Sequence, residues 1–286
     1  MKKMAIISPS SPTQELDTQK IAEVLKKYGY EPIYGQANFY KERFLAGIDE
    51  VRADDIMWAF IDKSIDAIMT LRGGYGSARL LDKIDYKFIA THKKPFFGFS
   101  DATALQLALW KKSKLVSYSG IQASFLQDKI NIGLEKTFES ALLGKKISWQ
   151  GLTPVKKGKA TGRLIGGTLS LITSLIGTPY EPKFKKAILV LEDIGEQPYQ
   201  IDRMLTQLRL AGVFDKISGV VLGDWHKCIS KDQNDGDITA VLSEHFNQLS
   251  IPVVKDFPYG HGIKGTVFPI GAKAHLDANK GTLDIL

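Results

Sequence analysis

The sequence contains very little cysteine and no long hydrophobic run. Its single cysteine, Cys228, rules out a disulfide within the chain and any cysteine-rich metal site. The amino terminus carries two lysines, but only the apolar residues 4–7 follow them before a serine and a proline, which is too short for a signal peptide. No run approaches the roughly 20 apolar residues that cross a membrane. We therefore expect no membrane partner and a cytoplasmic location.

Positive charge is in excess, but it is not concentrated in any tract. Lysine and arginine number 38 against 31 acidic residues, which gives a net charge of +7 and a pI near 9.2. Such an excess favours anionic partners in general, yet the lysines are scattered in pairs without interleaved aromatic residues. We therefore expect no nucleic-acid partner. The length of 286 residues suffices for one large domain or two ordinary ones.

Predicted strands alternate with predicted helices through the first half of the chain. Apolar segments predict strands at 4–7, 67–73 and 95–100. Helical spacing predicts helices near 18–29, 49–62, from about 77, and as an amphipathic helix at 101–112. Because this alternation is typical of a parallel sheet with right-handed crossovers, we expect an open α/β domain.

The composition changes near residue 145. Residues 145–167 are rich in Gly, Lys and Thr and contain short alternating segments, which suits β-structure or a linker better than a helix. Beyond them the pattern predicts helices at 168–177, 200–214 and 238–249, and β-segments at 186–193, 218–224, 252–260, 266–278 and 281–286. We predict a first domain over 1–145, a linker over 146–159 and a mixed, β-rich domain over 160–286.

Ser100 stands between a predicted strand and a predicted helix, in Gly98-Phe99-Ser100. A tight turn at the carboxyl end of a parallel strand points its middle residue outward, and glycine tolerates the close approach that such a corner needs. The amino terminus of the following helix offers N–H groups and a positive dipole end to an oxyanion. Ser100 is therefore a candidate nucleophile, and a helix cap is the alternative that this segment alone leaves open.

Three glycines follow another predicted strand, in the segment 71–81. The backbone N–H groups of Gly73, Gly74 and Gly76 could cradle a phosphate or complete an oxyanion hole. Their spacing matches neither the dinucleotide-binding fingerprint nor a P-loop. A plain tight turn is the alternative interpretation.

One histidine and a pair of carboxylates complete the candidates. Glu192 and Asp193 end an aliphatic strand, where a carboxylate can orient a histidine, and Glu196 is close in the sequence. His261 lies between two glycines in a predicted loop, which leaves its side chain accessible for general-base work. No histidine stands at metal-ligand spacing from these carboxylates, so we expect no metal site. A serine nucleophile needs a base, and the base needs a carboxylate, so Ser100, Glu192 and His261 supply three complementary roles.

Five motifs, in their order along the chain, resemble those of the LD-carboxypeptidases, which are serine peptidases of cytoplasmic murein recycling. The motifs are LRGGYGSARLL, GFSDATAL, GGTLSLITSLIGTPYEP, LEDIGEQPYQIDRMLTQLR and FPYGHG. The resemblance covers nearly the whole chain. It implies a flavodoxin-like α/β domain with an open parallel sheet at the amino terminus, followed by a smaller, β-rich carboxyl-terminal domain. It also implies a homodimer that needs no cofactor.

The same resemblance implies a Ser-His-Glu triad made of Ser100, His261 and Glu192. The choice of Glu192 over Glu196 as the acid rests on the alignment of the motif. One departure from the family pattern is Thr168 of the Gly-Gly-Thr-Leu motif, where many members have Asn.

The implied reaction is hydrolysis of the L,D amide bond that releases terminal D-alanine from a murein tetrapeptide. Backbone N–H groups of Asp101 and of Gly74 or its neighbour are expected to hold the oxyanion. Arg72 or Arg203 is expected to bind the substrate carboxylate. Two alternatives stay open: a peptidase resembling the microcin C immunity enzymes, which cleave an acyl-linked nucleotide, and a non-catalytic α/β module that binds an anion.

Overall fold

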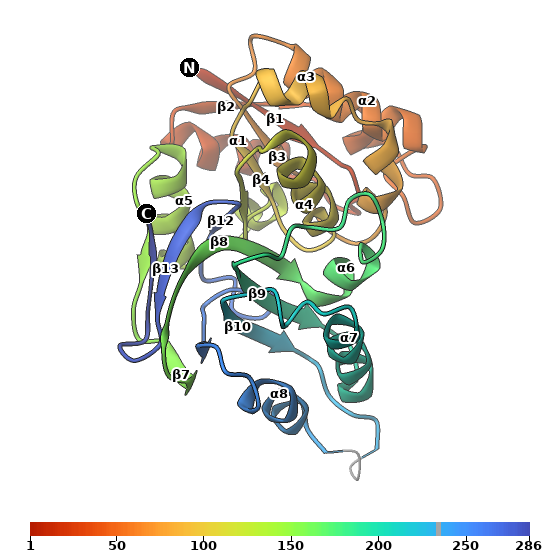
Figure 1. Cartoon of the computed structure of the whole chain (residues 1–286). Coiled ribbons are helices and arrows are strands. Elements are labelled where there is room, and N and C mark those ends of the chain that lie inside the picture. Colours follow the sequence, from red (N-terminus) through yellow and green to blue (C-terminus); the bar gives the residue numbers. More distant parts are fainter. Residues whose placement is uncertain (233–235) are drawn as a thin grey trace. The chain divides into compact units, whose positions relative to one another are not determined.

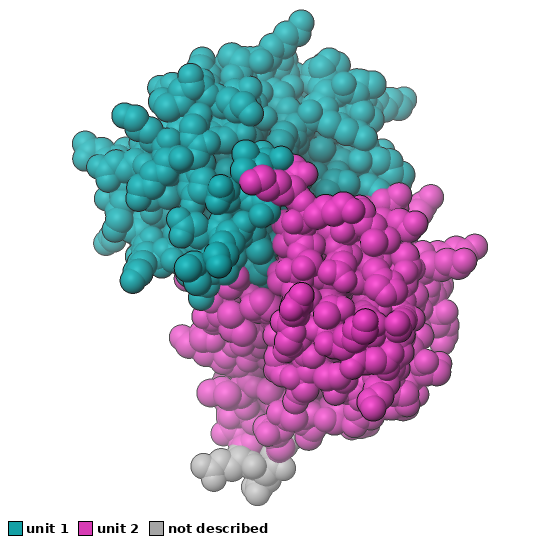
Figure 2. All heavy atoms as spheres, turned by 90° about the vertical axis from the view of Figure 1, so that its left-hand side faces the viewer, with its two compact units in different colours: residues 1–143, 266–269 teal, residues 144–265, 270–286 magenta. Residues whose placement is uncertain are grey.

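A computed structural model of the chain describes residues 1–232 and 236–286 (Figure 1). The chain divides into two compact units. Unit 1 comprises Met1–Leu143 and Thr266–Pro269, and unit 2 comprises Gly144–Gly265 and Ile270–Leu286 (Figure 2). Within the described ranges, every helix is too short or too polar to span a lipid bilayer.

Unit 1 is built on a six-stranded sheet with the strand order β12-β5-β4-β3-β1-β2. The first five strands in the chain all pair in parallel. They are β1 (Lys2–Ile7), β2 (Tyr30–Tyr34), β3 (Ala67–Thr70), β4 (Phe96–Gly98) and β5 (Ser117–Ser119), and β12 (Phe268–Ile270) lies at the edge. This order is that of flavodoxin-like folds, so the expected open α/β domain is confirmed. The strand order reverses between β1 and β3, and ligands of such sheets bind near the carboxyl ends of the strands at that point.

The four helical segments predicted in the first half of the chain are helical in unit 1, whereas the helices at 86–91 and 132–142 were not predicted. The α-helices are α1 (Thr18–Lys27), α2 (Asp49–Ile61), α3 (Tyr86–Thr91), α4 (Ala102–Ser113) and α5 (Ile132–Leu142), and short 3-10 helices are η1 (Gln36–Phe39), η2 (Ser77–Lys83) and η3 (Ala123–Gln127). The helix expected from Ser77 is thus the 3-10 helix η2. The expectation of an amphipathic α4 is wrong, because nearly all of its residues are buried, including Thr103 and Gln106. Gln106 can be buried there because its Nε2 donates to the Tyr118 carbonyl at 2.9 Å.

Unit 2 is built on an eight-stranded mixed sheet with the order β6-β14-β13-β8-β9-β10-β11-β7. The parallel strands are β8 (Lys159–Thr168), β9 (Ala187–Ile194), β10 (Gly219–His226) and β11 (Val253–Lys255). The antiparallel strands β6 (Ser148–Trp149), β7 (Thr153–Lys156), β13 (Lys273–Asp277) and β14 (Thr282–Ile285) flank them. The helices are α6 (Leu169–Ser174), α7 (Pro198–Leu210) and α8 (Ile238–Asn247). The expected mixed, β-rich second half is confirmed.

The segment 146–159, expected as a linker, contains β6 and β7 and is counted with unit 2. β6 pairs with β14 and β7 pairs with β11, so the segment closes both edges of the sheet. The middle of the sheet is the core of this unit. Residues Ala187 to Leu191 of β9 are at most 1% exposed, which is typical of a parallel strand covered on both faces.

Candidate active site

Ser100 lies in the turn between β4 and α4, and its backbone is strained. Its φ of +62° is a left-handed conformation that costs a residue other than glycine about 1–2 kcal/mol. Gly98, the last residue of β4, has no room for a side chain, because a Cβ there would lie 2.9 Å from the Ala102 Cβ. The N-cap position of α4 is occupied by Asp101 rather than by Ser100. The corner is therefore the tight strand-to-helix type that presents a serine at the carboxyl edge of a sheet.

The glycine loop after β3 packs against this corner. A Cβ on Gly73 would lie 2.7 Å from the Ser100 Cβ and 2.8 Å from its Oγ, so only glycine permits the approach. Gly74, with φ of +113°, faces Ser11 instead, and a Cβ there would collide with the Ser11 hydroxyl. Among the glycines of this loop, Gly73 is thus the one whose backbone touches the Ser100 side chain. Tyr75, next in the chain, donates its N–H to the Ser11 Oγ at 3.0 Å.

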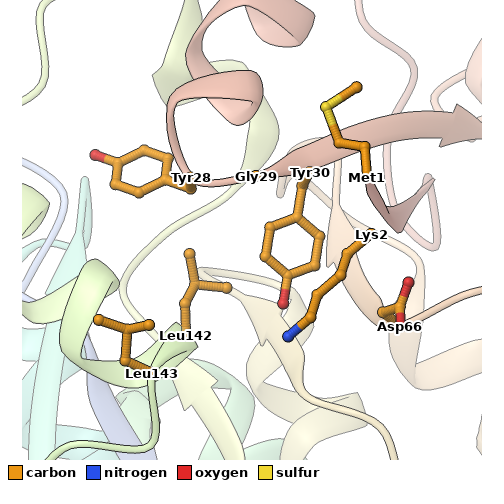
Figure 3. Close-up of a pocket in the computed structure, with 8 residues that line it drawn as sticks. All are labelled: Met1, Lys2, Tyr28, Gly29, Tyr30, Asp66, Leu142 and Leu143. Carbon is orange, nitrogen blue, oxygen red and sulfur yellow. The ribbon is translucent and has the colours of Figure 1, made fainter.

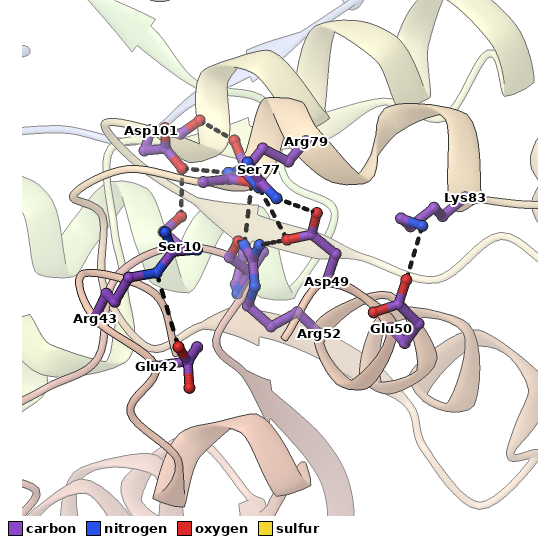
Figure 4. A network of polar contacts seen from close by, with 12 residues as sticks. Ser10, Glu42, Arg43, Asp49, Glu50, Arg52, Ser77, Arg79, Lys83 and Asp101 are labelled. Atoms are coloured by element: carbon purple, nitrogen blue, oxygen red, sulfur yellow. Dashed lines mark hydrogen bonds and ion pairs between the residues drawn. The ribbon is translucent and has the colours of Figure 1, made fainter. Parts of the chain in front are cut away.

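Asp101, the residue after Ser100, joins three loops of unit 1 through its buried carboxylate (Figure 4). Its Oδ2 accepts the Ser10 hydroxyl at 2.6 Å and the Ser77 N–H at 2.8 Å, and its carbonyl accepts the Ser77 hydroxyl at 2.5 Å. Burial raises the pKa of Asp101, and the hydrogen bonds from Ser10 and Ser77 act against that rise. Sequence reasoning gave only the backbone N–H of Asp101 a role and missed its side chain, because Ser10 is 91 residues away in the chain.

The buried guanidinium of Arg52 binds two of these loops (Figure 4). Arg52 of α2 is 0% exposed and donates to the carbonyls of Pro9 and Gly76, which belong to the loops after β1 and β3. Its charge is balanced by Asp49, which also accepts two bonds from Arg79 at 2.9 and 2.7 Å. The hydrogen bond from Arg79 is the main cause that lowers the pKa of Asp49.

In unit 2, Glu192 and His261 are joined directly. Glu192, near the end of β9, is 0% exposed, and its Oε2 lies 2.7 Å from the His261 Nδ1. Its Oε1 accepts the Thr168 hydroxyl at 2.6 Å. A histidine that donates its Nδ1 proton to a carboxylate keeps Nε2 as its basic nitrogen. A carboxylate that holds a histidine in this way is a feature shared by the acid and base pair of nucleophilic hydrolases.

The loop that carries His261 is fixed to β10 on both sides of the histidine. The Gly262 N–H donates to the Asp224 Oδ2 at 2.7 Å, and the Asp224 N–H donates to the Tyr259 carbonyl at 2.8 Å. A Cβ on Gly260 would lie 2.5 Å from the Asp224 Cβ, and one on Gly262 would collide with Asp224 and His226. The two glycines are therefore required by contact with β10, in addition to the accessibility that the sequence indicated. Asp224 itself was missed by sequence reasoning.

Asp193, the residue after Glu192, stabilises the local structure through its carboxylate. Its carboxylate accepts the N–H groups of Ser170 and Ile194, both at 2.8 Å, and so binds the first turn of α6. Burial is the main cause that raises the pKa of Asp193, to about 6, and the neighbouring Glu192 charge adds to it.

The two candidate arginines differ in their surroundings. Arg72 directly precedes Gly73 in unit 1, is half-buried, and donates to the Pro12 carbonyl at 3.1 Å. Arg203 lies on the exposed side of α7 in unit 2, where its guanidinium is 5.8 Å from the centre of the Tyr199 ring. Asp202, its neighbour in the sequence, contacts His245 at 2.7 Å.

Neither a metal cluster nor the cavity of unit 1 described next coincides with these residues. Among the residues with described positions, no group of three or more His, Cys, Asp or Glu side chains could hold a metal ion. A cavity of about 550 Å³ in unit 1 lies at the amino ends of β1 and β2, between residues such as Lys2, Tyr28, Tyr30 and Leu143 (Figure 3). Ser100 follows the carboxyl end of β4, so it and the cavity lie at opposite ends of these parallel strands.

A strained serine after a parallel strand and a histidine held by a buried carboxylate are together typical of serine hydrolases. The comparison with protein families gives the particular class. The model of the LD-carboxypeptidase N-terminal domain matches residues 4–120, and that of the LD-carboxypeptidase C-terminal domain matches residues 161–276. The chain belongs to the LD-carboxypeptidase family and is an enzyme, a peptidase of the serine type. This overturns the alternative of a non-catalytic anion-binding module.

Relatives with assigned names agree with the family. The chain is 33% identical over 293 residues to the "Probable murein peptide carboxypeptidase" of Bacillus subtilis, with 98% of this chain and 90% of the relative covered. The crystal structure of muramoyltetrapeptide carboxypeptidase from Oxalobacter formigenes is similar with a TM-score of 0.88 and 32% identity, covering 99% of this chain and 98% of that one. An MccF-like protein from Bacillus anthracis is similar with a TM-score of 0.88 and 27% identity, covering 100% and 96%.

Proposed function

We propose that this enzyme is a muramoyltetrapeptide carboxypeptidase, which hydrolyses the L,D amide bond and releases terminal D-alanine from a murein tetrapeptide. The observation that carries the proposal is the 2.7 Å bond between His261 Nδ1 and the fully buried Glu192, because it equips a histidine to act as a base. The names of the relatives from B. subtilis and O. formigenes support a murein peptide as substrate.

In the proposed mechanism, His261 Nε2 takes the proton of the Ser100 hydroxyl while Oγ attacks the carbonyl carbon of the diamino residue. The tetrahedral intermediate collapses as the C–N bond breaks, and His261 returns the proton to the amine of the departing D-alanine. A water molecule, deprotonated by His261, then hydrolyses the acyl-enzyme and restores the Ser100 hydroxyl. Glu192 holds the histidine tautomer and stabilises the imidazolium in both halves of the reaction.

Backbone N–H groups of Asp101 and Gly74 are proposed as the oxyanion hole, with a contribution on the order of 3 kcal/mol for each donor. The close approach of the neighbouring Gly73 to the Ser100 side chain supports a role for this loop. Arg72 is the better candidate for the substrate carboxylate, because it adjoins Gly73, which packs against the Ser100 side chain. Arg203 is the second candidate.

The second candidate function is cleavage of an acyl-linked nucleotide. The similarity to the MccF-like protein of B. anthracis, at 27% identity over the whole chain, favours it enough to require a test. On the family resemblance we also propose that the enzyme is a cytoplasmic homodimer, which light scattering coupled to size-exclusion chromatography tests by mass.

The test is mass-spectrometric detection of D-alanine release from murein tetrapeptides of the lysine and the diaminopimelate type. Ser100→Ala and His261→Ala are expected to abolish release, whereas the matched controls Ser140→Ala and His92→Ala, at surface positions of unit 1, are expected to retain it. If neither tetrapeptide is cleaved and an aminoacyl nucleotide is, the murein assignment is wrong and the second candidate replaces it.

A further inference from the structure

Thr168 ends β8 at the N-cap position of α6, yet its hydroxyl does not cap that helix. A threonine at this position ordinarily accepts an N–H from the first turn. Here the Ser170 N–H of that turn is bound by the Asp193 carboxylate at 2.8 Å. The Thr168 hydroxyl donates instead to the Glu192 Oε1, at 2.6 Å.

The pairing of two strands fixes this contact. β8 and β9 are parallel, and Thr168 and Glu192 are partners in their register. Thr168 is 3% exposed and Glu192 is 0% exposed, so water does not compete for the bond. A hydrogen bond to an ionised, buried acceptor is stronger than one between neutral groups at the surface.

Both oxygens of Glu192 are therefore engaged, one by each neighbour. Thr168 binds Oε1, which fixes the plane of the carboxylate, and Oε2 lies 2.7 Å from the His261 Nδ1. Threonine suits this task, because its β-branched side chain has few χ1 rotamers. Without the hydroxyl, a buried carboxylate oxygen would lose a donor, and the carboxylate would be freer to rotate away from the histidine.

We propose that Thr168 is a positioning residue of the catalytic apparatus, which acts through Glu192 to hold His261 in its reactive orientation. The expected effect of Thr168 on turnover rests on the function proposed above. The hydrogen bonds between Thr168 and Glu192 and between Glu192 and His261 do not depend on that function. Thr168 therefore has a role beyond local packing at the position where the family resemblance indicated a departure.

Two variants and a control separate this role from packing. Thr168→Val keeps the shape and removes the donor, and Thr168→Ser keeps the donor. Thr173→Val is the control, because Thr173 is also buried, at 6% exposure, and its hydroxyl donates to carbonyls of α6. We expect Thr168→Val to lower kcat for D-alanine release about 10- to 100-fold with KM nearly unchanged, since a bond to a charged group is lost. Thr168→Ser is expected to restore most of the rate and Thr173→Val to leave it unchanged.

A spectroscopic measurement makes the test independent of the substrate. The proton between His261 Nδ1 and Glu192 is expected to give a low-field proton NMR signal in the full-length enzyme, assigned by its loss in His261→Ala. We expect this signal to shift or broaden in Thr168→Val and to stay in place in Thr168→Ser and Thr173→Val. An unchanged signal in Thr168→Val, or a serine variant as impaired as the valine variant, overturns the positioning role. If the wild-type enzyme cleaves no tetrapeptide but the signal responds as expected, the proposed substrate is wrong and the positioning role stands.

Discussion

Replacing Gly73 by alanine introduces a clash that only the Ser100 side chain causes. The added Cβ would lie 2.7 and 2.8 Å from the Ser100 Cβ and Oγ, whereas its next neighbour, the Asp101 nitrogen, is at an ordinary distance of 3.5 Å. Gly73 is not among the glycines with positive φ, so its backbone accepts alanine without strain. The cost of Gly73→Ala should therefore disappear in a Ser100→Gly background.

The magnitude follows from these distances. Forcing an extra methyl group into a filled space costs about 1–3 kcal/mol. A glycine replaced by alanine without strain gains about 0.4–1 kcal/mol through the unfolded chain. We therefore expect Gly73→Ala to destabilise unit 1 by about 1–2 kcal/mol in the wild-type background, and to stabilise it slightly when residue 100 is glycine. The Ser100→Gly change should itself relieve the strain of the +62° φ.

The assay is native-state hydrogen exchange of the buried α4 amides, which reports the free energy of opening of unit 1 separately from unit 2. The four proteins form a double-mutant cycle whose coupling energy is about 2 kcal/mol by this reasoning. The surface change Ser140→Ala in α5 serves as control. If Gly73→Ala costs the same in both backgrounds, the contact between the glycine loop and Ser100 is not the source of the constraint.

Two further predictions concern unit 2. Burial raises the pKa of Asp193 from its ordinary value of 3.8 to about 6, so the folded protein retains near pH 5 a proton that the unfolded chain has lost. Its contribution to stability is complete below about pH 4 and is lost as the pH rises through 6, a change of about 3 kcal/mol. Urea unfolding of wild type and Asp193→Asn at pH 4.5 and 7.5 measures this change in the free energy of unfolding. A difference between the two proteins that does not vary with pH would refute the prediction. Asp224→Ala removes the 2.7 Å bond to the Gly262 N–H, so hydrogen exchange of that amide should accelerate about 10- to 100-fold. Turnover should fall, while the environment of Glu192 stays the same. Unchanged exchange would contradict the anchoring role of Asp224.

Much of the fold could be predicted because local patterns decide it. The alternation of apolar strands with helices in the first half defines an open parallel sheet, and the structure has it. The burial of α4 could not be predicted from periodicity, because Thr103 and Gln106 break its apolar sequence and imply a solvated face that the fold then covers. For 146–159 the sequence could not decide between β-structure and a linker, because the strand partner of Trp149 is Leu283, far along the chain.

The candidate site divides in the same way. Ser100, Glu192 and His261 could be proposed as candidates because strand ends and flanking glycines mark them in the sequence, although the choice of Glu192 over Glu196 rested on the family resemblance. Glu192 and Asp193 are adjacent on β9, and successive side chains of a strand point to opposite faces, so one reaches His261 and the other α6. Only the tertiary structure shows which face holds the histidine.

The contacts of the supporting residues were missed for a related reason. Thr168 contacts a residue 24 positions away, and Asp224 contacts one 38 positions away. The carboxylate of Asp101 joins loops from three different strand ends. Such partners come into contact only when the sheet has formed, so no local sequence pattern predicts them.

The central claim is that Ser100 is acylated during turnover, and intact-protein mass spectrometry after rapid acid quench tests it most directly. With a murein tetrapeptide, the account predicts a transient mass increase equal to the substrate without its D-alanine, located on Ser100 by peptide mapping and absent in Ser100→Ala. Release of D-alanine by Ser100→Ala at the wild-type rate, with no adduct formed, would contradict the account.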